Sequence, residues 1–395
     1  MIRGFRFATT VLAATAALSS TALAQECGGD FNQFLAGVKQ EAVSMGLSPQ
    51  AADSVLSAAN VSQQVLDHDR GQSVFKQDFL EFSQRMISSN RMQNGQANMQ
   101  RYADTFARAE QQFGVPAAVI TAFWGLETDF GAVQGDVNTV DALATLAHDC
   151  RRPALFRPHL IGAIAMAERG TLDPNTMTGA WAGEIGQVQM LPADIVQYGV
   201  DGDGDGRVDM KNSAEDAIMT AANFIRALGW RPGEPWLQEV QIPESLPWER
   251  TGLANGTTVG EWQAMGVTAR NGSLPAPSLP ARLIMPQGRH GPTFLAYPNY
   301  DVYLEWNQSF IYTTSAAYFA TRLAGAPPYD AGNPPAGLSN AQMVDLQQRL
   351  QAKGYDVGEI DGILGSGTRQ AVRQEQLRLG MPADAWPTPE LLSQI

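Results

Sequence analysis

A long stretch of helical patterning, which ends at Gly229, constrains the fold of this chain more than any other feature. From residue 30 to about residue 230, apolar residues recur at spacings of three and four between caps, glycines and prolines. The pattern predicts helices over 103–113, from 116 through 127, and over 139–150, 158–168, 191–198 and 214–228. Eight prolines then punctuate residues 232–286, which predicts loops and a few short strands before a helix near 315–323. We therefore expect a mainly α fold with a minor β portion.

A proline-rich segment divides the rest of the chain. Residues 326–337 include four prolines and have almost nothing to bury, which is typical of a linker. Residues 338–395 carry a helical pattern of their own, in which Met343, Leu346 and Leu350 share one face and Gly354 ends the helix. A second helix is expected from Thr368. The mature chain is therefore expected to comprise a body over residues 25–325, a linker over 326–337 and a small unit over 338–395.

The first 24 residues are typical of a secretory signal. They contain two arginines, a short run rich in Ala, Leu and Thr, and small residues at Ala22 and Ala24. We expect cleavage near Gln25 and a soluble protein of the periplasm. A lipoprotein is disfavoured because Glu26, rather than a small residue, precedes Cys27. The 27 Lys and Arg against 40 Asp and Glu give a net charge of −13, which argues against a nucleic-acid partner.

Only two cysteines are present, Cys27 and Cys150. In an oxidising compartment they are expected to form a single disulfide between the mature N-terminus and the helix around Cys150. Two free thiols are the alternative.

One acid ends an apolar helical stripe. Ile120, Phe123 and Trp124 lie on the same helix face as Glu127. Aromatic neighbours that exclude water from a carboxyl favour its protonated form, which is what a general acid for glycosidic cleavage needs near neutral pH. The alternative is a helix-end glutamate that makes a structural hydrogen bond. Asp129 should point away from Glu127 and act as a cap.

Three strings resemble the lytic murein transglycosylase B family, in order across about residues 30–325. They are Trp-Gly-Leu-Glu-Thr-Asp-Phe-Gly at 124–131, Leu-Ala-Thr-Leu at 143–146 and Trp-Ala-Gly-Glu-Ile-Gly-Gln-Val-Gln-Met-Leu-Pro at 181–192. The resemblance implies a lysozyme-like, goose-type-like helical catalytic domain without an organic cofactor. It also implies cleavage of the MurNAc-β-1,4-GlcNAc bond of peptidoglycan with formation of 1,6-anhydro-MurNAc. Glu127 aligns with the single catalytic acid of that family, acting as acid and then as base.

The same resemblance implies substrate contacts. Gln189 aligns with a glutamine that contacts a sugar, although it could instead cap a helix. Trp306 and Tyr312 align with tyrosines that line the glycan groove, although either could be ordinary core. Phe224 and Phe82 stand where that family has tyrosine, and Ala180 where it has serine, so individual sugar contacts lose a hydroxyl.

An acidic loop has the spacing of a calcium site. Carboxylates occupy positions 1, 3, 5 and 9 of the loop, with Gly206 at position 6 and the carbonyl of Arg207 at position 7. Position 12 is Asn212, so a later acid, Asp216 or Glu215, would have to close the site, although both also fit a helix cap. We expect a structural Ca²⁺ here, with a solvated acidic turn as the alternative. The expected ligands are Asp201, Asp203, Asp205, Arg207, Asp209 and Asp216.

The C-terminal unit resembles a small three-helix peptidoglycan-binding domain. The strings that carry the resemblance are Leu-Gln-Gln-Arg-Leu-Gln-Ala-Lys-Gly-Tyr at 346–355 and Gly-Glu-Ile-Asp-Gly-Ile-Leu-Gly-Ser-Gly-Thr-Arg-Gln-Ala-Val at 358–372. Glu375 replaces a buried aromatic of that family, so weaker packing or affinity is expected. The unit would hold the enzyme on glycan strands. A monomer is expected, with proteins of wall synthesis or division as further partners. A hydrolytic muramidase and a non-catalytic wall-binding scaffold are the competing interpretations.

Overall fold

The mainly helical architecture expected from the sequence is confirmed in a computed structural model, which describes residues 27–71 and 77–395. The secretory signal expected over residues 1–24 lies outside the described residues. Among the described helices, none has the length and apolar character that a membrane crossing requires.

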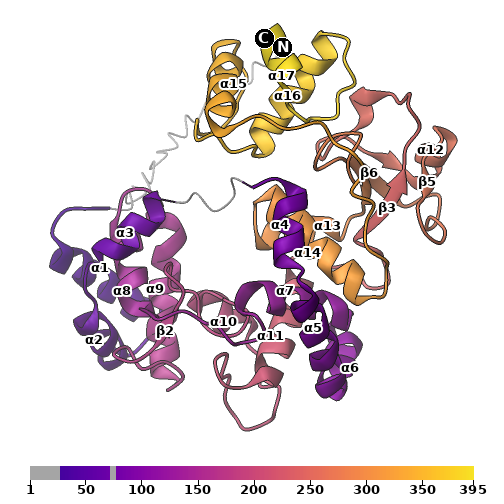
Figure 1. Ribbon diagram of the computed structural model, residues 1–395. Coiled ribbons are helices and arrows are strands. Elements are labelled where there is room, and N and C mark those ends of the chain that lie inside the picture. Colours follow the sequence, from indigo (N-terminus) through magenta and orange to yellow (C-terminus); the bar gives the residue numbers. More distant parts are fainter. Residues whose placement is uncertain (1–26, 72–76) are drawn as a thin grey trace, which may run out of the picture.

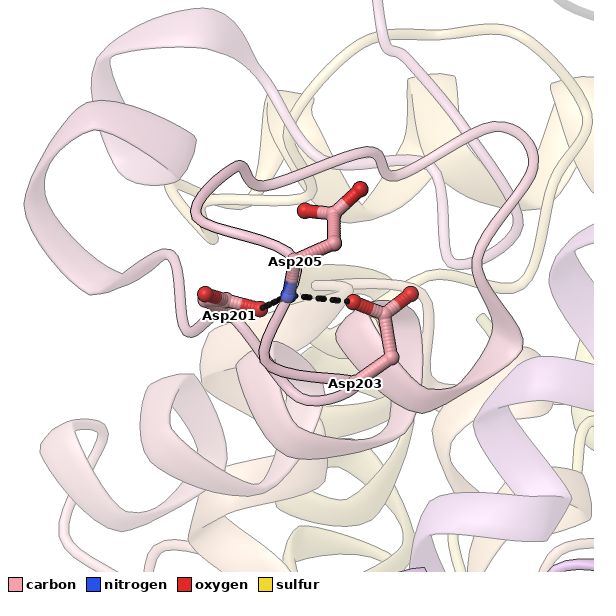
Figure 2. A group of neighbouring side chains, drawn as sticks. All are labelled: Asp201, Asp203 and Asp205. Carbon is pink, nitrogen blue, oxygen red and sulfur yellow. Dashed lines mark hydrogen bonds between the residues drawn. The ribbon is translucent and has the colours of Figure 1, made fainter.

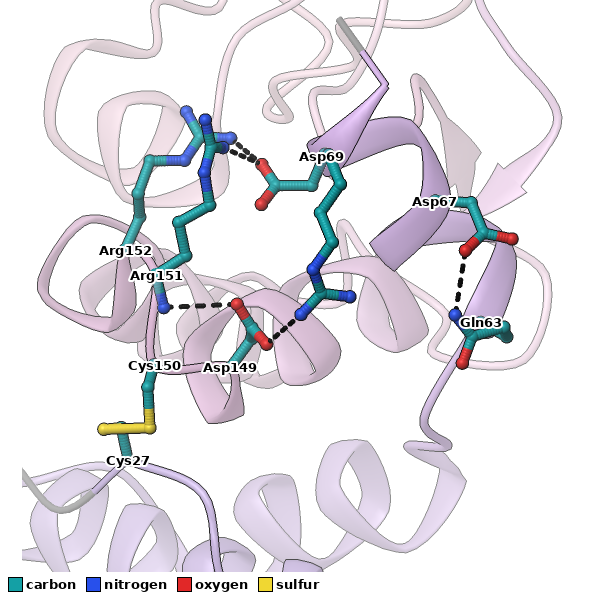
Figure 3. A network of polar contacts seen from close by, with 9 residues as sticks. Cys27, Gln63, Asp67, Asp69, Asp149, Cys150, Arg151 and Arg152 are labelled. Carbon is teal, nitrogen blue, oxygen red and sulfur yellow. Dashed lines mark hydrogen bonds and ion pairs between the residues drawn. A yellow bond between two sulfur atoms is a disulfide. The ribbon is translucent and has the colours of Figure 1, made fainter. Parts of the chain in front are cut away.

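Five helices gather into an N-terminal lobe (Figure 1). They are α1 (Phe31–Ser44), α2 (Pro49–Ala58), α3 (Gln63–Arg70), α8 (Thr139–His148) and α9 (Pro153–Glu168). The expected disulfide is confirmed: Cys27, before α1, is bonded to Cys150, after α8 (Figure 3). In the same loop Arg151 and Arg152 pair with Asp69, whose side chain is almost completely buried. The disulfide fixes the segment before α1, and the ion pairs fix the end of α3, against the connection between α8 and α9.

A second group of helices surrounds α7 (Ala117–Thr128). Nearly every residue of α7 is buried, because α5, α6, α11 and α14 all pack against it. The group comprises α4 (Phe79–Met86), α5 (Ser89–Arg101), α6 (Ala103–Phe113), α11 (Ala214–Ala227), α13 (Tyr300–Trp306) and α14 (Phe310–Leu323). A further helix, α10 (Pro192–Tyr198), joins the two groups, because it packs against α9 of the lobe and against α11. A short antiparallel ribbon of β1 (Val137–Asn138) and β2 (Thr178–Gly179) flanks α8.

The proline-punctuated region between α11 and α13 forms a five-stranded sheet in the order β4-β6-β7-β3-β5. Its strands are β3 (Leu237–Gln241), β4 (Thr257–Thr258), β5 (Thr268–Ala269), β6 (Pro280–Ile284) and β7 (Phe294–Ala296), and all their pairings are antiparallel. The connections carry the 3₁₀ turn η1 (Trp248–Arg250) and α12 (Val259–Ala264). Leu283 of β6 pairs with Leu295 of β7, and both enter a small core around Trp262.

The C-terminal unit contains α15 (Asn340–Ala352), α16 (Ser366–Arg378) and α17 (Pro389–Gln394) around its own apolar core. Glu375 of α16 is 1% exposed, yet its carboxylate accepts hydrogen bonds from Lys353, Tyr355 and Arg378. The Arg378 guanidinium contributes most to lowering the pKa of Glu375, to about 2. A buried ionic network therefore occupies the position where the sequence suggested weaker packing.

The expectation that residues 326–337 bury almost nothing is wrong at Tyr329. Its ring lies 4.7 Å from that of Tyr318 between centroids, and its hydroxyl is 2.8 Å from the hydroxyl of Ser83. Farther along, the amide of Asn333 donates to the carbonyl of His290. The segment therefore follows the body instead of acting as a freely moving spacer, because a tyrosine can bury its ring while keeping a polar partner.

Several expected helix boundaries differ from the structure. The local pattern predicts a helix start at Pro158, but this proline lies inside α9, which begins at Pro153. The helix expected over 139–150 ends at His148, and the last body helix begins at Phe310, five residues before the expected Ser315. Local signals mark two of the observed starts: Pro153 occupies the first turn of α9, and the Ser309 side chain caps α14 by accepting from the amide of Tyr312. The two-residue difference at His148 is within the usual variation of helix ends.

Candidate active site

The carboxylate of Glu127 lies where α7 meets the turn between α13 and α14. From α13, Trp306 Nε1 donates a 2.9 Å hydrogen bond to Glu127 Oε1. From α14, the Tyr312 hydroxyl donates to the same oxygen. The structure thus brings together three of the residues that the sequence analysis singled out, although about 180 positions separate the acid from its donors.

Aromatic rings surround this contact. The ring of Trp306 lies 4.3 Å from that of Phe123 and 5.6 Å from that of Phe224, measured between centroids. Ile120, Phe123 and Trp124 are each no more than 2% exposed, as the apolar stripe on α7 predicts. Tyr312 is also buried, at 6% exposure, so its hydroxyl holds the acid while little of its ring faces solvent.

The electrostatics of the site favour a protonated acid. Burial raises the pKa of Glu127 to about 7, and the hydrogen bonds from Tyr312 and Trp306 oppose that rise. The nearby charge of Glu184 raises the pKa of Glu127 further. A carboxyl with this pKa can both give and take a proton near neutral pH.

Glu184 is a residue of the site that sequence reasoning missed. It lies in the loop after β2, where its Oε2 accepts from the amide of Ala182, and burial raises its own pKa. The available signal was an acid inside the string at 181–192, but spacing alone could not show that it lies close enough to influence Glu127.

Gln187 is a second residue that the sequence analysis missed. Its Oε1 accepts from Trp124 Nε1 at 3.0 Å, and its carbonyl accepts from Thr128 Oγ1 at 2.5 Å. Trp124 and Thr128 flank Glu127 in the last turns of α7, so Gln187 fixes the helix end that carries the acid. Asp129 follows as the C-cap, with φ of 52°, and pairs with Arg91 at 3.1 Å, as expected for a residue that points away from the acid.

Gln189 lies in a tight turn between β2 and α10. Its φ is 50°, and its Nε2 donates to the carbonyl of Gly186 at 2.8 Å. Gly186 itself has φ of 80°, and a side chain there would clash with the backbone of Met210. The N-cap of the next helix, α10, is Leu191 rather than Gln189. The contact of Gln189 with a sugar stays a prediction.

The two phenylalanines predicted to face substrate occupy different settings. Phe224 of α11 packs between Tyr198 and Trp306 at the edge of the aromatic cluster. Phe82 is 3% exposed on α4, which packs against α14. Their contacts with substrate stay predictions.

The acidic loop brings three of the expected metal ligands together. Carboxylate oxygens of Asp201, Asp203 and Asp205 all lie within 4.8 Å of one another, on exposed side chains (Figure 2). The amide of Asp205 donates to both other carboxylates, which curls the loop around them.

The remaining acids of this loop shape its backbone. Asp216 is 1% exposed and accepts hydrogen bonds from the amides of Gly202, Asp203 and Asp209. Asp209 accepts from the amides of Lys211 and Asn212. Asp209 and Asp216 thus lie outside the cluster of Asp201, Asp203 and Asp205. The amide of Arg207 donates to Asp205 Oδ1.

Comparisons with known proteins agree with this arrangement of units. The family model described as a transglycosylase SLT domain matches residues 30–321, and one for a peptidoglycan binding domain matches residues 339–395. Membrane-bound lytic murein transglycosylase B from Escherichia coli is 33% identical over 195 residues, or 48% of this chain and 52% of the relative. The match thus spans about half the length of that curated relative.

Two solved structures extend the similarity to three dimensions. SltB3 from Pseudomonas aeruginosa, crystallised in complex with NAG-anhNAM-pentapeptide, is 34% identical with a TM-score of 0.83. The alignment covers 93% of this chain and 99% of SltB3. The Escherichia coli lytic transglycosylase Slt35, in complex with calcium, is 27% identical with a TM-score of 0.64, over 76% of this chain and 96% of Slt35.

Proposed function

Because the chain belongs to the transglycosylase SLT family, we propose that it cleaves peptidoglycan glycan strands as a lytic transglycosylase, with Glu127 as the catalytic acid. The observation that carries the proposal is the setting of Glu127. Burial raises its pKa to about 7, and two donors from another part of the chain fix one of its oxygens. The substrate class is supported by SltB3, which was crystallised with NAG-NAM-pentapeptide and with NAG-anhNAM-pentapeptide.

The proposed reaction uses one carboxyl twice. The Glu127 carboxyl first protonates the glycosidic oxygen as the bond between C1 of MurNAc and O4 of GlcNAc breaks. Its carboxylate then removes the proton from the C6 hydroxyl of the same MurNAc, as O6 forms a bond to C1. The products are a 1,6-anhydro-MurNAc end and a free GlcNAc 4-hydroxyl, and no water is consumed. The nucleophile belongs to the substrate, so its high effective concentration replaces a positioned water.

The two donors suit this double role. Trp306 and Tyr312 both donate to Oε1, so they stabilise the carboxylate that exists between the two proton transfers. The same hydrogen bonds fix the orientation of the carboxyl group, which leaves Oε2 as the oxygen to exchange protons with the substrate.

A muramidase is the second candidate, and Glu184 is the observation that favours it. Hydrolysis needs a second carboxylate as nucleophile or base. Glu184 is an acid whose charge acts on Glu127. Burial raises the pKa of Glu184, so its carboxylate is a stronger base once ionised and could activate a water above that pKa.

Digestion of purified sacculi followed by mass spectrometry of the released muropeptides distinguishes the candidates. Anhydro-muropeptides support the transglycosylase, and reducing ends one water heavier indicate a muramidase. Glu127→Gln should abolish release, whereas Glu305→Gln, which changes an exposed acid on α13, should retain it. Full activity in Glu127→Gln would refute the proposed mechanism. Sacculus binding by the wild-type protein without any release would indicate the scaffold.

We further propose that the acidic loop holds a structural Ca²⁺. The three clustered carboxylates of Asp201, Asp203 and Asp205 match the oxygen ligands that this hard cation prefers. Among the similar structures, that of Slt35 is a complex with calcium. The ion would stiffen the loop between α10 and α11 without taking part in the chemistry.

The C-terminal unit and the cellular location complete the proposal. Residues 339–395 match a peptidoglycan binding domain, so this unit would keep the body close to glycan strands. The signal expected at 1–24 would export the protein to the periplasm, where it would act as a monomer. Interaction with proteins of wall synthesis or division stays a prediction.

A further inference from the structure

Two buried arginines of α16 dock the C-terminal unit onto the body. Arg369 is 7% exposed, its guanidinium donates to the carbonyl of Pro286 at 2.9 Å, and its Cζ lies 4.5 Å from the centroid of the Phe310 ring. Arg373, one turn later, is 9% exposed and donates to the carbonyls of Trp248 and Glu249. The first arginine thus contacts a catalytic helix, and the second contacts the turn η1 beside the sheet.

Phe310 is the first residue of α14, and Tyr312 follows two positions later. Residues two apart on a helix point to opposite sides. Accordingly, Phe310 faces the guanidinium of Arg369, whereas the Tyr312 hydroxyl reaches Glu127. The first turn of α14 is therefore held between the peptidoglycan-binding unit and the catalytic acid.

Hydrogen bonds connect the first turn of α14 to the segment that carries Trp306, the second donor to Glu127. Thr314 Oγ1 donates to the carbonyl of Phe310 and lies 2.7 Å from the hydroxyl of Tyr300, at the start of α13. Thr313 Oγ1 donates at 2.6 Å to the carbonyl of Asn307, directly after Trp306. Displacement of Phe310 would consequently move the segment that carries both Trp306 and Tyr312.

The chemistry of Arg369 argues for more than docking. Burial lowers the pKa of its guanidinium to about 10, and its Nε has no hydrogen-bond partner among the described residues. Burying a cation under these conditions costs free energy that an apolar residue would not cost. A planar guanidinium over a ring gives a directional contact that fixes the ring's position.

We propose that Arg369 of the C-terminal unit is a positioning residue for the catalytic acid, holding Phe310 so that Trp306 and Tyr312 keep their hydrogen bonds to Glu127. The inference rests on the proposed function of Glu127. It makes the peptidoglycan-binding unit a structural part of the active site in addition to a wall anchor.

The test compares Arg369→Met with Arg373→Met in the full-length chain. Both variants remove one docking arginine from α16, but only the first loses the contact with α14. The substrate is a soluble tetrasaccharide of alternating GlcNAc and MurNAc, and the readouts are kcat at saturation and its pH profile. Thermal unfolding and circular dichroism verify that each variant is folded.

Arg369→Met should lower kcat roughly ten- to a hundredfold, because a small displacement of catalytic groups has effects of this size. It should also move the alkaline limb of kcat to higher pH, because the hydrogen bonds from Tyr312 and Trp306 lower the pKa of Glu127. Glu184 acts on the pKa of Glu127 and Tyr303 on that of Tyr312, and neither residue is changed in this variant. Arg373→Met should retain the wild-type kcat and pH profile.

Two further variants keep the proposal testable if Arg369→Met does not fold. Phe310→Leu should reproduce the shifted limb, and combined with Arg369→Met it should add nothing further. Arg369→Lys keeps a cation beside the ring but lacks the planar guanidinium, so its kcat should lie between those of Arg369→Met and the wild type. The inference would be overturned if Arg369→Met and Arg373→Met lowered kcat equally. It would also be overturned if the alkaline limb of kcat stayed at its wild-type pH in both Arg369→Met and Phe310→Leu. Persistent activity in Glu127→Gln would instead overturn the proposed function itself.

Discussion

Trp306 Nε1 donates a 2.9 Å hydrogen bond to the carboxylate of Glu127 across 179 positions of sequence. The indole is stacked on Phe123, which precedes Glu127 by one helical turn, so the same helix face supplies both the acid and the support for its donor. A carboxyl in this setting is partly shielded from water and yet has a partner for its charged form. This balance allows one group to act as acid and then as base.

The Trp306 donor can be removed while an aromatic ring is kept at this position. Trp306→Phe should raise the pKa of Glu127, because a hydrogen bond that stabilises the carboxylate is lost. The alkaline limb of kcat should move upward by about one to two pH units, since hydrogen bonds to charged groups contribute on the order of 1.5–3 kcal/mol and about 1.4 kcal/mol corresponds to one pKa unit. Trp236→Phe deletes an indole N–H that donates to Ala317 instead and should leave the limb in place. A limb that stays fixed in Trp306→Phe would contradict the assigned role.

The charge of Glu184 raises the pKa of Glu127, whereas the hydrogen bond from Trp306 lowers it. Glu184→Gln should therefore lower that pKa and move the alkaline limb to lower pH. Activity on sacculi at pH 8 should fall while activity at pH 5 is retained. Glu184→Asp keeps the charge and serves as the control. If Glu184→Gln instead abolishes a hydrolytic product seen with the wild type, Glu184 acts as a base and the muramidase is the better description.

Ionisation of Glu127 should destabilise the folded protein. The pKa of the group is about 7 when folded and near 4.5 when unfolded, so the folded state binds more protons between these values. The free energy of unfolding should therefore fall as pH rises from about 4.5 to 7. Glu127→Gln lacks this charge, so its stability relative to wild type should rise over that window by on the order of 1–3 kcal/mol. Urea unfolding of both proteins at pH 4.5, 6 and 8 measures the difference, and a constant difference would show an ordinary pKa.

The acidic loop contains two kinds of aspartate, which should respond differently to calcium. Asp203→Asn and Asp205→Asn alter the clustered carboxylates, so they should reduce the increase in Tm that Ca²⁺ gives the wild type. Asp216→Ala deletes the acceptor of three backbone amides and should cost about 1–3 kcal/mol whether or not Ca²⁺ is present. Scanning calorimetry with Ca²⁺ or with a chelator separates these effects. A wild-type Tm that changes with neither Ca²⁺ nor the chelator would favour the solvated acidic turn.

Local sequence signals account for much of the helical body. The apolar spacing of Ala103–Phe113 predicts a helix, and the helix ends at Gly114, whose φ of 72° suits a C-terminal cap. The pairing of the disulfide follows from the cysteine count, because only Cys27 and Cys150 are present, although the count alone left two free thiols open. In contrast, Pro158 gives a false helix start, since a proline in a long helix can be tolerated where neighbouring helices support the backbone.

The candidate site is predictable only in part. The apolar stripe on α7 singles out Glu127, and the resemblance to a known family singles out Trp306 and Tyr312. Their actual relationship to the acid, as hydrogen-bond donors, depends on how α13 and α14 cross α7. The influence of Glu184 and the bond from Trp124 to Gln187 likewise depend on loops whose course no local pattern specifies.

The sequence by itself therefore determined Glu127 as the candidate acid, because residue type and helical spacing are local properties. Only the tertiary structure decided the environment of the acid, because a pKa depends on burial and on charges brought from distant parts of the chain. The same holds for the C-terminal unit. Its helices could be recognised from residues 338–395 alone, whereas the contact of Arg369 with Phe310 exists only once that unit is packed against α14.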